Sequence, residues 1–550
     1  MTETKVPVLI VGGGIVGLSA ALFLAHHGIQ SLLVERHSGT SIHPRARSVN
    51  ARTMELYRSL GADVAVRAAG SDLAASKGIY MGASLREVIE PKPRKGSSGK
   101  FPGSGLLASI SPVTGAWGTQ DVIEPVLLAT ARERGVDARF FTECVDVRQD
   151  ENSITATLRD RESGATSTVC AEYLVAADGA GSPIRNRLGA TTSGRGTMGH
   201  LLNILFHADL HDLVSQREFS LCIIDRPEVF GLFTSINNKD RWVFHLAYDP
   251  SKGEKAEDFT PEQCRELLRI ALGFPDIEIE IKSILPWEPS VRVADQFQHG
   301  RIFLAGDAAH QMPPWAGQGA NSGVADVHNL AWKLAAVLKG HASSELLSTY
   351  DVERHPVGRA AAEISASAAD ERGIISRKIT PAIIVSVIKR IFIISGHGYT
   401  YSSQAIVPEN TFPLGGITWR ALSIASLALG LDGRPGSRAP HVWIEHQGKR
   451  ISTLDLFGRD FVLLAGSDGQ SWCEAAMKAS TALDIEMRFY TAGPTGKVID
   501  HRYELQTAAG ISAQGALLVR PDGFVAWRER RLPPDSQQKL EQVMKQVLSR

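Results

Sequence analysis

The sequence predicts an α/β protein of two or three domains, and three observations support this class. The chain has 550 residues, which is more than one hydrophobic core normally holds. Residues 6–35 show a strand pattern, a glycine-rich turn, a helix pattern and a second strand. From about residue 194 to 285 the texture changes to alternating segments such as Arg241–Tyr248. Such alternation is typical of a half-buried antiparallel sheet, so we expect an inserted second domain.

The opening segment is predicted to form a βαβ unit. Val6–Val11 is a continuous apolar run, as expected for a strand that is buried on both faces. Ile15–His27 has helical periodicity and Gly28 follows where the helix would end. Ser31–Glu35 is the second predicted strand.

A dinucleotide fingerprint lies between these elements. Gly12, Gly14 and Gly17 give G-x-G-x-x-G directly after the strand, and Glu35 stands at the end of the next strand. The glycines permit a tight turn and a close approach of the backbone to a pyrophosphate, and the acid can accept hydrogen bonds from a ribose diol. The pattern predicts a Rossmann-like nucleotide site but does not by itself choose between NAD and FAD. A glycine turn without a ligand is the alternative.

The middle of the chain supplies the remaining predicted elements. Glu90–Gly105 is rich in Pro, Gly, Ser and Lys and is predicted to be an exposed loop. The other expected elements are a helix over Gln120–Gly135, strands over Ile154–Leu158 and Ser167–Val175, a strand over Glu278–Ile284, a buried strand over Arg301–Ala305, and a helix over Asn321–Lys339 that ends at Gly340.

A smaller α/β unit is predicted at the C-terminus. Residues 431–440 (LDGRPGSRAP) look like a linker, and Phe461–Ala465 is strand-like. Ala516–Val519 and Phe524–Trp527 flank a Pro-Asp-Gly turn, which is a hairpin signal.

Two further segments carry a resemblance to a known family. Ala176–Arg187 (AADGAGSPIRNR) contains Asp178-Gly179, and Gly306–Leu334 (GDAAHQMPPWAGQGANSGVADVHNLAWKL) is a long and specific match. With these segments the chain resembles the FAD-dependent aromatic hydroxylases, single-component flavoprotein monooxygenases related to p-hydroxybenzoate hydroxylase and phenol hydroxylase. The resemblance spans nearly all of residues 5–375 and implies FAD as the cofactor.

The resemblance and the residue patterns together imply a domain layout. A discontinuous FAD-binding domain is expected over residues 1–190 and 286–375, with a mixed or antiparallel-sheet substrate domain inserted over 191–285 and parts of 76–105. A helical segment and linker is expected over 376–434. Residues 435–550 resemble the thioredoxin-like domain of phenol hydroxylase and the polyketide hydroxylases, although Cys473 stands without a CxxC partner. This domain is therefore expected to be structural or dimer-forming.

The Gly306–Leu334 segment is expected to surround the flavin. Asp307 follows a strand at the carboxyl edge of the sheet, where its carboxylate can accept a hydrogen bond from a ribityl chain. Pro313-Pro314 would stiffen the next loop, and Gly317 and Gly319 would permit close approach to a flat ring. The helix that starts near Asn321 would direct its positive end at the pyrimidine edge of the ring.

Other predicted site residues each have a structural alternative. The family uses the Asp178-Gly179 turn for both FAD and NAD(P)H, although an ordinary turn would look alike. Arg45 and Arg47 follow Pro44 where relatives keep an arginine near the flavin phosphates, and Gln120 heads a helix where relatives place a flavin contact; a solvated surface position is the alternative for all three. Arg36, next to Glu35, completes the predicted cofactor set, and Arg185 is a weaker candidate.

The resemblance also implies a reaction. NAD(P)H would reduce FAD, O2 would add at flavin C4a, and the hydroperoxide would transfer one oxygen atom to an electron-rich ring. No phenol-activating base can be named; His310 and Arg372 are weak candidates, and Trp315 is expected either to wall the substrate pocket or only to cover the loop. Ser41–Leu60 resembles hydroxylases of polycyclic polyketides and large phenols. Baeyer–Villiger or epoxidising monooxygenases, a flavin oxidase or redox sensor, and a nucleotide-binding module without flavin remain alternatives.

Composition limits the partners. Formal net charge is zero and no long basic run is present, so neither nucleic acid nor an anionic membrane is expected as a partner. The five cysteines are scattered without metal-ligand spacing, and the N-terminus has no signal-peptide layout, which favours a reducing cytoplasm and no metal. The expected partners are an aromatic small molecule and O2, with a homodimer left open.

Overall fold

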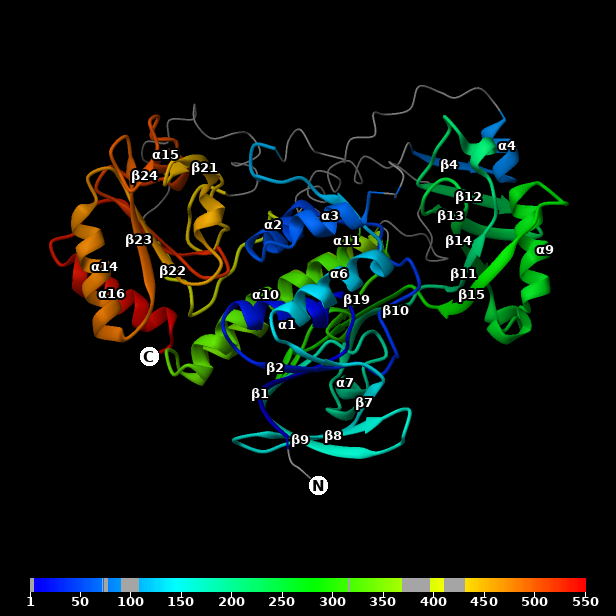
Figure 1. Ribbon diagram of the computed structural model, residues 1–550, viewed down its shortest axis with the longest axis horizontal. Coiled ribbons are helices and arrows are strands. Elements are labelled where there is room, and N and C mark those ends of the chain that lie inside the picture. Colours follow the sequence, from blue (N-terminus) through cyan, green and yellow to red (C-terminus); the bar gives the residue numbers. More distant parts are fainter. Residues whose placement is uncertain are drawn as a thin grey trace.

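The computed structural model describes residues 4–71, 73, 78–90, 108–314, 317–367, 396–409 and 431–550. Three sheet-containing lobes lie side by side, with the chain's first sheet in the middle lobe (Figure 1). The expected α/β architecture is confirmed: a Rossmann-like FAD-binding domain, an inserted mixed-sheet domain and a thioredoxin-like C-terminal domain.

The first sheet has the order β17-β18-β9-β1-β2-β6, and the β7–β8 hairpin extends it from β9. Its pairs β1–β2, β1–β9, β9–β18 and β2–β6 are parallel, so these strands end at the same edge. The strands are β1 (Thr4–Val11), β2 (Ser31–Val34), β6 (Asp137–Arg139), β7 (Thr142–Gln149), β8 (Ile154–Asp160), β9 (Thr166–Ala176), β17 (Gln298–His299) and β18 (Ile302–Leu304).

Helices and two small sheets cover this first sheet. The long helix α10 begins at Gln318, one turn earlier than the sequence suggested, and packs against α1. The elements are α1 (Ile15–His26), α2 (Ala51–Ser59), α3 (Asp63–Ala69), α6 (Gln120–Glu133), α7 (Pro183–Arg187), α10 (Gln318–Leu338), α11 (Thr349–Ser367), the 3₁₀ turns η3 (Gly306–Ala308) and η5 (Ser344–Ser348), and the strands β3 (Ser48–Val49), β5 (Ala116–Trp117), β10 (Thr192–Thr197), β16 (Ser290–Ala294) and β19 (His310–Gln311).

The second sheet has the order β15-β11-β14-β13-β12-β4 and is antiparallel except for the β12–β4 pair. One face forms an apolar core with α9, whose capping box at Thr260 and Gln263 fixes its start. The elements are β4 (Ile79–Gly82), α4 (Leu85–Ile89), β11 (His200–His207), α8 (His211–Val214), β12 (Leu221–Arg226), β13 (Val229–Ser235), β14 (Arg241–Tyr248), η1 (Pro250–Lys252), η2 (Ala256–Asp258), α9 (Pro261–Leu272) and β15 (Glu280–Trp287).

The third sheet has the order β21-β20-β24-β23-β22-β25-β26. The expected C-terminal hairpin is present as the antiparallel pair β25–β26. The elements are β20 (Trp443–His446), β21 (Lys449–Ser452), η6 (Thr453–Leu456), β22 (Phe461–Ala465), α14 (Gln470–Leu483), β23 (Met487–Gly493), β24 (Val498–Ile499), α15 (Glu504–Ala509), β25 (Ala516–Val519), β26 (Val525–Glu529) and α16 (Ser536–Val547).

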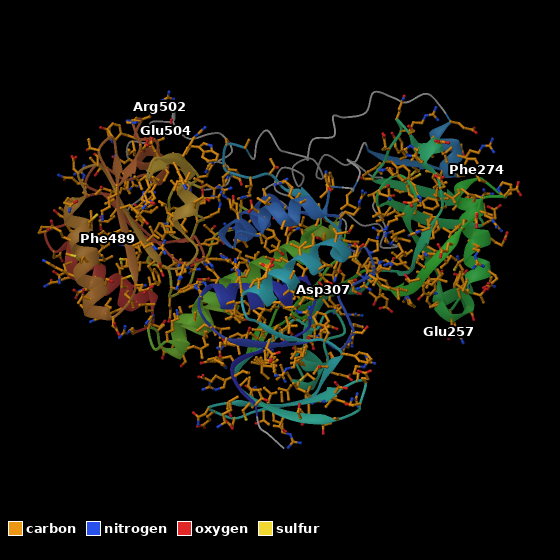
Figure 2. The ribbon with its side chains drawn as sticks, viewed as in Figure 1. Glu257, Phe274, Asp307, Phe489, Arg502 and Glu504 are labelled. Carbon is orange, nitrogen blue, oxygen red and sulfur yellow. The ribbon has the colours of Figure 1, made fainter. Side chains whose placement is uncertain are left out.

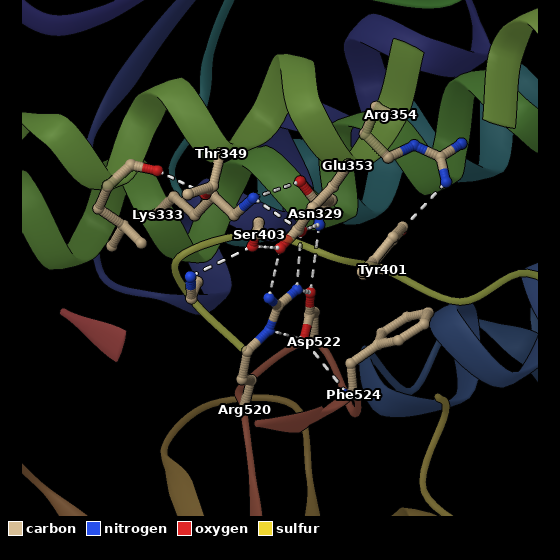
Figure 3. A network of polar contacts seen from close by, with 12 residues as sticks. Asn329, Lys333, Thr349, Glu353, Arg354, Tyr401, Ser403, Arg520, Asp522 and Phe524 are labelled. Carbon is tan, nitrogen blue, oxygen red and sulfur yellow. Dashed lines mark hydrogen bonds and ion pairs between the residues drawn. The ribbon is translucent and has the colours of Figure 1, made fainter. Parts of the chain in front are cut away.

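A buried polar network joins the C-terminal domain to the FAD-binding domain (Figure 3). Glu353 of α11 accepts hydrogen bonds from Lys333 of α10 at 2.9 Å and from Arg520 at 2.7 and 3.0 Å. Arg520 also pairs with Asp522, and the side chains of Lys333, Glu353, Arg520 and Asp522 are fully buried. Asn329 and Ser403 donate to Glu353 and complete what we call the Glu353 network.

Candidate functional site

Turns from distant parts of the sequence meet at the carboxyl edge of the first sheet. A Cβ on Gly12, whose φ is +111°, would lie 2.2 Å from the carbonyl oxygen of Ala177. A Cβ on Gly323 of α10 would lie 3.0 Å from the Cα of Gly306. Glycine is therefore required for the fingerprint turn to reach the Asp178-Gly179 turn, and for α10 to reach the Gly306-Asp307 turn.

Glu35 lies where the fingerprint predicts. Its Oε2 accepts a hydrogen bond of 2.6 Å from the backbone N–H of Gly13, and its Oε1 accepts one of 2.8 Å from the N–H of His37. The carboxylate is thus fixed beside the glycine turn, in position for a ribose diol. The neighbouring Arg36 is exposed.

No sequence pattern singled out Glu124, a buried acid on α6. It accepts hydrogen bonds from Ile15 N at 3.1 Å, Ser41 N at 2.7 Å and the Gln120 side chain at 2.5 Å. Burial raises the pKa of Glu124 despite these donors. The side chain fixes Gln120 and the loop after β2 at the start of α1, and its spacing one helical turn after Gln120 was the available signal.

Asp307 is an exposed acid near the centre of the molecule (Figure 2). It makes no hydrogen bond to any residue that the structure describes. Its surroundings limit hydration, which raises its pKa, while His310 and Arg45 act in the opposite direction. The carboxylate is therefore accessible to a ligand hydroxyl although protein surrounds it, and we call this position the Asp307 recess.

The Gly306-Asp307 turn is held from behind by Asp326 of α10. Asp326 accepts from Gly306 N at 3.1 Å, from His310 Nε2 at 2.7 Å and from Arg354 Nε at 2.8 Å. Burial opposes ionisation of Asp326, but His310 and Arg354 outweigh it and keep its pKa low. His310, the weak catalytic candidate, is therefore fully buried with one ring nitrogen engaged by a structural carboxylate.

The Asp178-Gly179 turn contacts the Gly306-Asp307 turn through Arg185. Asp178 accepts from the Ser182 hydroxyl at 2.6 Å and from Ile184 N at 3.2 Å, which caps α7. Arg185 donates to the carbonyls of Ala308 at 3.0 Å and Ala180 at 2.8 Å. Arg185, weighted least from the sequence, thus joins two of the predicted cofactor turns.

The N-terminus of α10 has no side-chain cap. Gly317 is its N-cap with φ +61°, and no side chain caps the first turn. Asn321 uses its amide internally: it accepts from Asn50 N at 3.0 Å and Thr53 Oγ1 at 2.7 Å, and it donates to Gly317 O at 2.6 Å. A Cβ on Gly319 would lie 3.6 Å from Asp307 Oδ1. Pro314 is exposed beside this turn, whereas Trp315 and Arg372 lie outside the described residues.

The two predicted arginines face different surroundings. Arg45 is exposed and acts electrostatically on Asp307. Arg47 donates 3.0 Å to the carbonyl of Ser220, at the start of β12, and its guanidinium lies 6.0 Å from the Trp117 ring. Burial lowers the pKa of Arg47 to about 10. The loop after β2 therefore connects the Asp307 recess with the second sheet.

The structure has two recesses with different linings among the described residues. A small one lies at the meeting point of α1, α2, α6 and α10 and is lined by Ile15, Ser48, Thr53, Tyr57, Asn321 and Val324 among others. A wider, open groove runs along α9 and is lined mainly by charged side chains such as Glu262 and Arg265. Because α9 covers the outer face of the second sheet, this groove lies away from the glycine turns (Figure 1).

The arrangement fits FAD: an acid at the ribose position, an accessible Asp307 and an uncapped helix start converge at one sheet edge. Within the described residues no cluster of His, Cys, Asp and Glu could hold a metal ion. None of the helices described is long and apolar enough to cross a bilayer.

Comparison with known proteins identifies the class. Residues 5–365 match the family model of the FAD binding domain, and residues 432–550 match that of the aromatic-ring hydroxylase C-terminal domain. The chain belongs to the FAD-dependent aromatic-ring hydroxylases, and it is an FAD-dependent monooxygenase.

Individual relatives resemble the chain over its whole length. It is 39% identical over 578 residues to the tetracenomycin A2 monooxygenase-dioxygenase of Streptomyces glaucescens, covering 100% of this chain and 98% of that one. It is 39% identical over 559 residues to a 4-methyl-5-nitrocatechol 5-monooxygenase of Burkholderia, with 100% and 98% coverage. The crystal structure of aklavinone-11 hydroxylase with FAD and aklavinone superimposes with a TM-score of 0.83 at 35% identity, covering 100% of both chains.

Proposed function

We propose that this enzyme inserts one oxygen atom from O2 into an aromatic ring that is phenolic or polycyclic and polyketide-like, with NADPH or NADH as the reductant. The relatives support this range, since their printed substrates include both polycyclic aromatics and a monocyclic catechol. The observation that carries the proposal is the accessible Asp307 beside the uncapped start of α10, in a recess that the loop around Arg45 joins to the second sheet.

Each part of the predicted site has a proposed task. Gly12, Gly14 and Gly17 leave room for the pyrophosphate at the start of α1, and Glu35 binds the adenosine ribose. Asp307 accepts hydrogen bonds from the ribityl chain. The first turn of α10, around Gly317 and Gly319, directs its positive end at the pyrimidine edge of the ring.

The chain's own contribution to the chemistry is positioning and the exclusion of water. When bound, FAD supplies the redox chemistry, accepting hydride from NAD(P)H and activating O2. The apolar side chains between the second sheet and Trp117 limit the entry of water, which would otherwise divert the oxidant. Arg45, beside Asp307, is placed to attract an anionic reductant. Arg47 and Gln120 hold the loop after β2 in place next to it. The remaining predicted residues, Arg36, Asp178, Gly179, Gly306 and Pro314, keep their proposed cofactor role.

A spectrum and a turnover assay test the proposal. The purified protein should be yellow, and oxidation of NADPH or NADH should be stimulated by one of a panel of phenols and hydroxyanthraquinones. The product should be heavier by one oxygen atom that comes from ¹⁸O2. An ester product would indicate Baeyer–Villiger chemistry instead, and stoichiometric peroxide with every compound would indicate an oxidase. A colourless protein that FAD cannot reconstitute would overturn the proposal.

A further inference from the structure

The face of the second sheet that is turned toward the FAD-binding domain carries a polar triad. Asn203 of β11 and His245 of β14 are register partners, and Thr234 lies on the next strand, β13. His245 Nδ1 lies 2.5 Å from Asn203 Oδ1, and its Nε2 lies 3.1 Å from Thr234 Oγ1. The alternate residues of these strands form the apolar core with α9, so the triad occupies the centre of the opposite face.

The hydrogen bonds define the protonation of this triad. An amide oxygen only accepts, so Nδ1 of His245 carries the ring proton and Nε2 presents a lone pair to the Thr234 hydroxyl. Burial lowers the pKa of His245 to about 4, and the nearby His43 acts in the same direction. The ring is therefore neutral at neutral pH, and His43 lies near enough to interact with it.

His43 is less well paired, because its ring approaches the Asn203 backbone but neither ring nitrogen makes a hydrogen bond of good geometry. Its side chain is only 4% exposed, and both nitrogens are buried without a hydrogen bond to any residue that the structure describes. Burial, together with Arg45, lowers the pKa of His43 to about 4, while Asp121 and Asn203 act weakly to raise it. A neutral imidazole, with one ring nitrogen near the Asn203 backbone and an acceptor nitrogen without a partner, thus lies on the loop after β2 beside the triad.

Further buried atoms without partners lie on the loop that carries His43 and on the segment paired with it. Within the described part of the chain these are Thr119 Oγ1, Asp121 Oδ1 and Arg47 Nη2, although Asp121 Oδ2 accepts 2.7 Å from Arg241. They come from the same two segments, since Gln120 N donates 2.7 Å to the carbonyl of Arg45. Buried polar atoms in proteins are nearly always hydrogen-bonded, so several unpaired atoms on two adjoining segments indicate a site that a ligand or water completes.

The surroundings of this polar cluster are apolar. Leu205 and Val243 lie on the same sheet face as the triad and pack with Ile236, Leu73 and the Trp117 ring. Apolar walls with a few convergent polar atoms are the usual construction of a site for a flat organic ligand. The loop that carries His43 also carries Arg45, which interacts with Asp307, so the cluster borders the proposed flavin recess.

We propose that His43, backed by the Asn203–His245–Thr234 triad, is the subsite that binds a hydroxyl substituent of the aromatic substrate. One ring nitrogen of His43 accepts the hydroxyl proton in a hydrogen bond, and the other donates. The inference rests on the proposed function and narrows its substrate class to rings with a free hydroxyl at this position, as opposed to their ethers. Asn203 and Thr234 act as positioning residues because they fix the ring and tautomer of His245.

The test is a matched pair of ligands on the FAD-loaded enzyme. Perturbation of the flavin spectrum gives Kd for 1-hydroxyanthraquinone and its O-methyl ether, and for catechol and guaiacol. Wild type should bind the hydroxyl form of the productive pair more tightly. His43→Leu should lose about tenfold to a hundredfold in affinity for the hydroxyl form and change little toward the ether. Thr234→Val, which leaves His245 Nε2 without its donor, should reduce the same preference to a smaller extent.

The matched control is His27→Leu. His27 is a buried histidine at the end of α1, and burial lowers its pKa well below the usual value, but it lies outside the cluster. The control should keep the full hydroxyl preference, and all three variants should retain FAD.

Equal loss of both ligands in His43→Leu, or an unchanged preference, would overturn the subsite while leaving the hydroxylase proposal intact. A wild-type enzyme whose flavin spectrum responds to none of the four aromatics would overturn both.

Discussion

The FAD-binding domain meets its two neighbouring domains through interfaces with different buried groups. Toward the C-terminal domain, the Glu353 network places two cations and two anions in full burial, and they pair with one another (Figure 3). Toward the second sheet, His43 and His245 are buried neutral imidazoles, and several polar atoms have no partner among the described residues. The contrast applies to these two clusters: the ion pair Arg241–Asp121 also lies at the second sheet, and single nitrogens of Arg52, His397 and Arg438 lack partners beside the C-terminal domain.

The presence or absence of hydrogen-bond partners distinguishes buried polar groups with a structural role from those that can bind a ligand. A closed set of pairs stabilises one arrangement and offers nothing to a ligand. Buried polar atoms without partners lower the stability of the fold unless a ligand or water binds to them. On this basis we expect the Glu353 network to stabilise the molecule, and we propose that the His43 cluster binds the substrate.

The largest expected effect is on stability, from Arg520→Met. Removing the guanidinium leaves Glu353 and Asp522 buried with only Lys333 as a counter-charge, which should cost about 3–5 kcal/mol of unfolding free energy. Urea unfolding followed by tryptophan fluorescence measures this, since Trp332 lies 5.2 Å from the Arg520 guanidinium. The matched control is Arg434→Met, whose ion pair with Asp432 is half exposed and should contribute less than about 1 kcal/mol. Equal midpoints for the two variants would remove the Glu353 network from the stabilising interactions.

Next in size is the loss of cofactor from Asp307→Ala. Because Asp307 is exposed and has no described hydrogen-bond partner, the variant should fold normally. The lost bond from a ligand hydroxyl to a charged group corresponds to about 1.5–3 kcal/mol, or roughly a tenfold to hundredfold weaker FAD affinity. Flavin content after gel filtration and a fluorescence titration report it. Retention of FAD at the wild-type level would exclude Asp307 from the site.

The pH dependence of ligand binding tests whether the histidines at the interface with the second sheet are neutral. His43 and His245 have pKa values of about 4, so the affinity of wild type for an uncharged aromatic should be flat between about pH 6 and 8. Asn203→Asp places a carboxylate against His245 Nδ1 and should raise the pKa of that ring, so that it gains a proton as pH falls through the new value. Binding should then change severalfold across this range, with Arg45 and Asp121 as the other charges nearby.

Asn237→Asp, at a half-buried position in the turn between β13 and β14, is the control and should stay flat. A flat profile for Asn203→Asp would show that the triad does not affect ligand binding.

The same pKa values predict that acid lowers the free energy of unfolding. Burial lowers the pKa of both rings in the folded protein, so their neutral forms cost no stability above about pH 6.5. As pH falls toward 4, the unfolded chain gains protons that the folded rings do not, and stability is lost.

The smallest expected effect is that of Cys473→Ala. Cys473 is buried on α14 and burial raises the pKa of its thiol, which makes it a poor nucleophile. Turnover should be unchanged with or without dithiothreitol, and the stability loss should be about 1 kcal/mol. A marked fall in turnover would give the C-terminal domain a role beyond the structural one that its interface indicates.

Local patterns predicted the positions of the turns and strands that carry the proposed cofactor residues. The fingerprint from Gly12 to Gly17, the acid at Glu35 and the position of Asp307 after a buried strand are set by short segments, and parallel strands bring their ends to one edge. Helix starts were less exact, as α10 shows, because Gly317 rather than a side chain caps it.

The groups that the sequence did not reveal depend on pairing between distant segments. Asn203 and His245 are brought together by strand register alone, and a shift of one residue would turn both to the apolar core. Glu124 reaches Ile15 only after α6 has packed against α1. Arg520 and Glu353 are separated by 167 residues. No periodicity or spacing encodes such contacts, which arise from how the finished elements pack.

The Glu353 network also bears on how the C-terminal domain could be assembled with the rest of the chain. Lys333 and Glu353 form one ion pair on the FAD-binding domain, and Arg520 and Asp522 form another within a single turn of the C-terminal domain. Within this network each side is electrically neutral before the two meet, and docking adds the Arg520–Glu353 contacts to pairs that already exist. Neutral pairs lose less hydration than lone charges and exert little attraction at a distance. Elsewhere in the same interface, opposite charges of the two domains face each other as Arg58–Asp455 and Glu55–Arg438. The Glu353 network should therefore add little salt dependence to the union of these domains, and salt should act on the union mainly through the partly exposed Arg58–Asp455 pair.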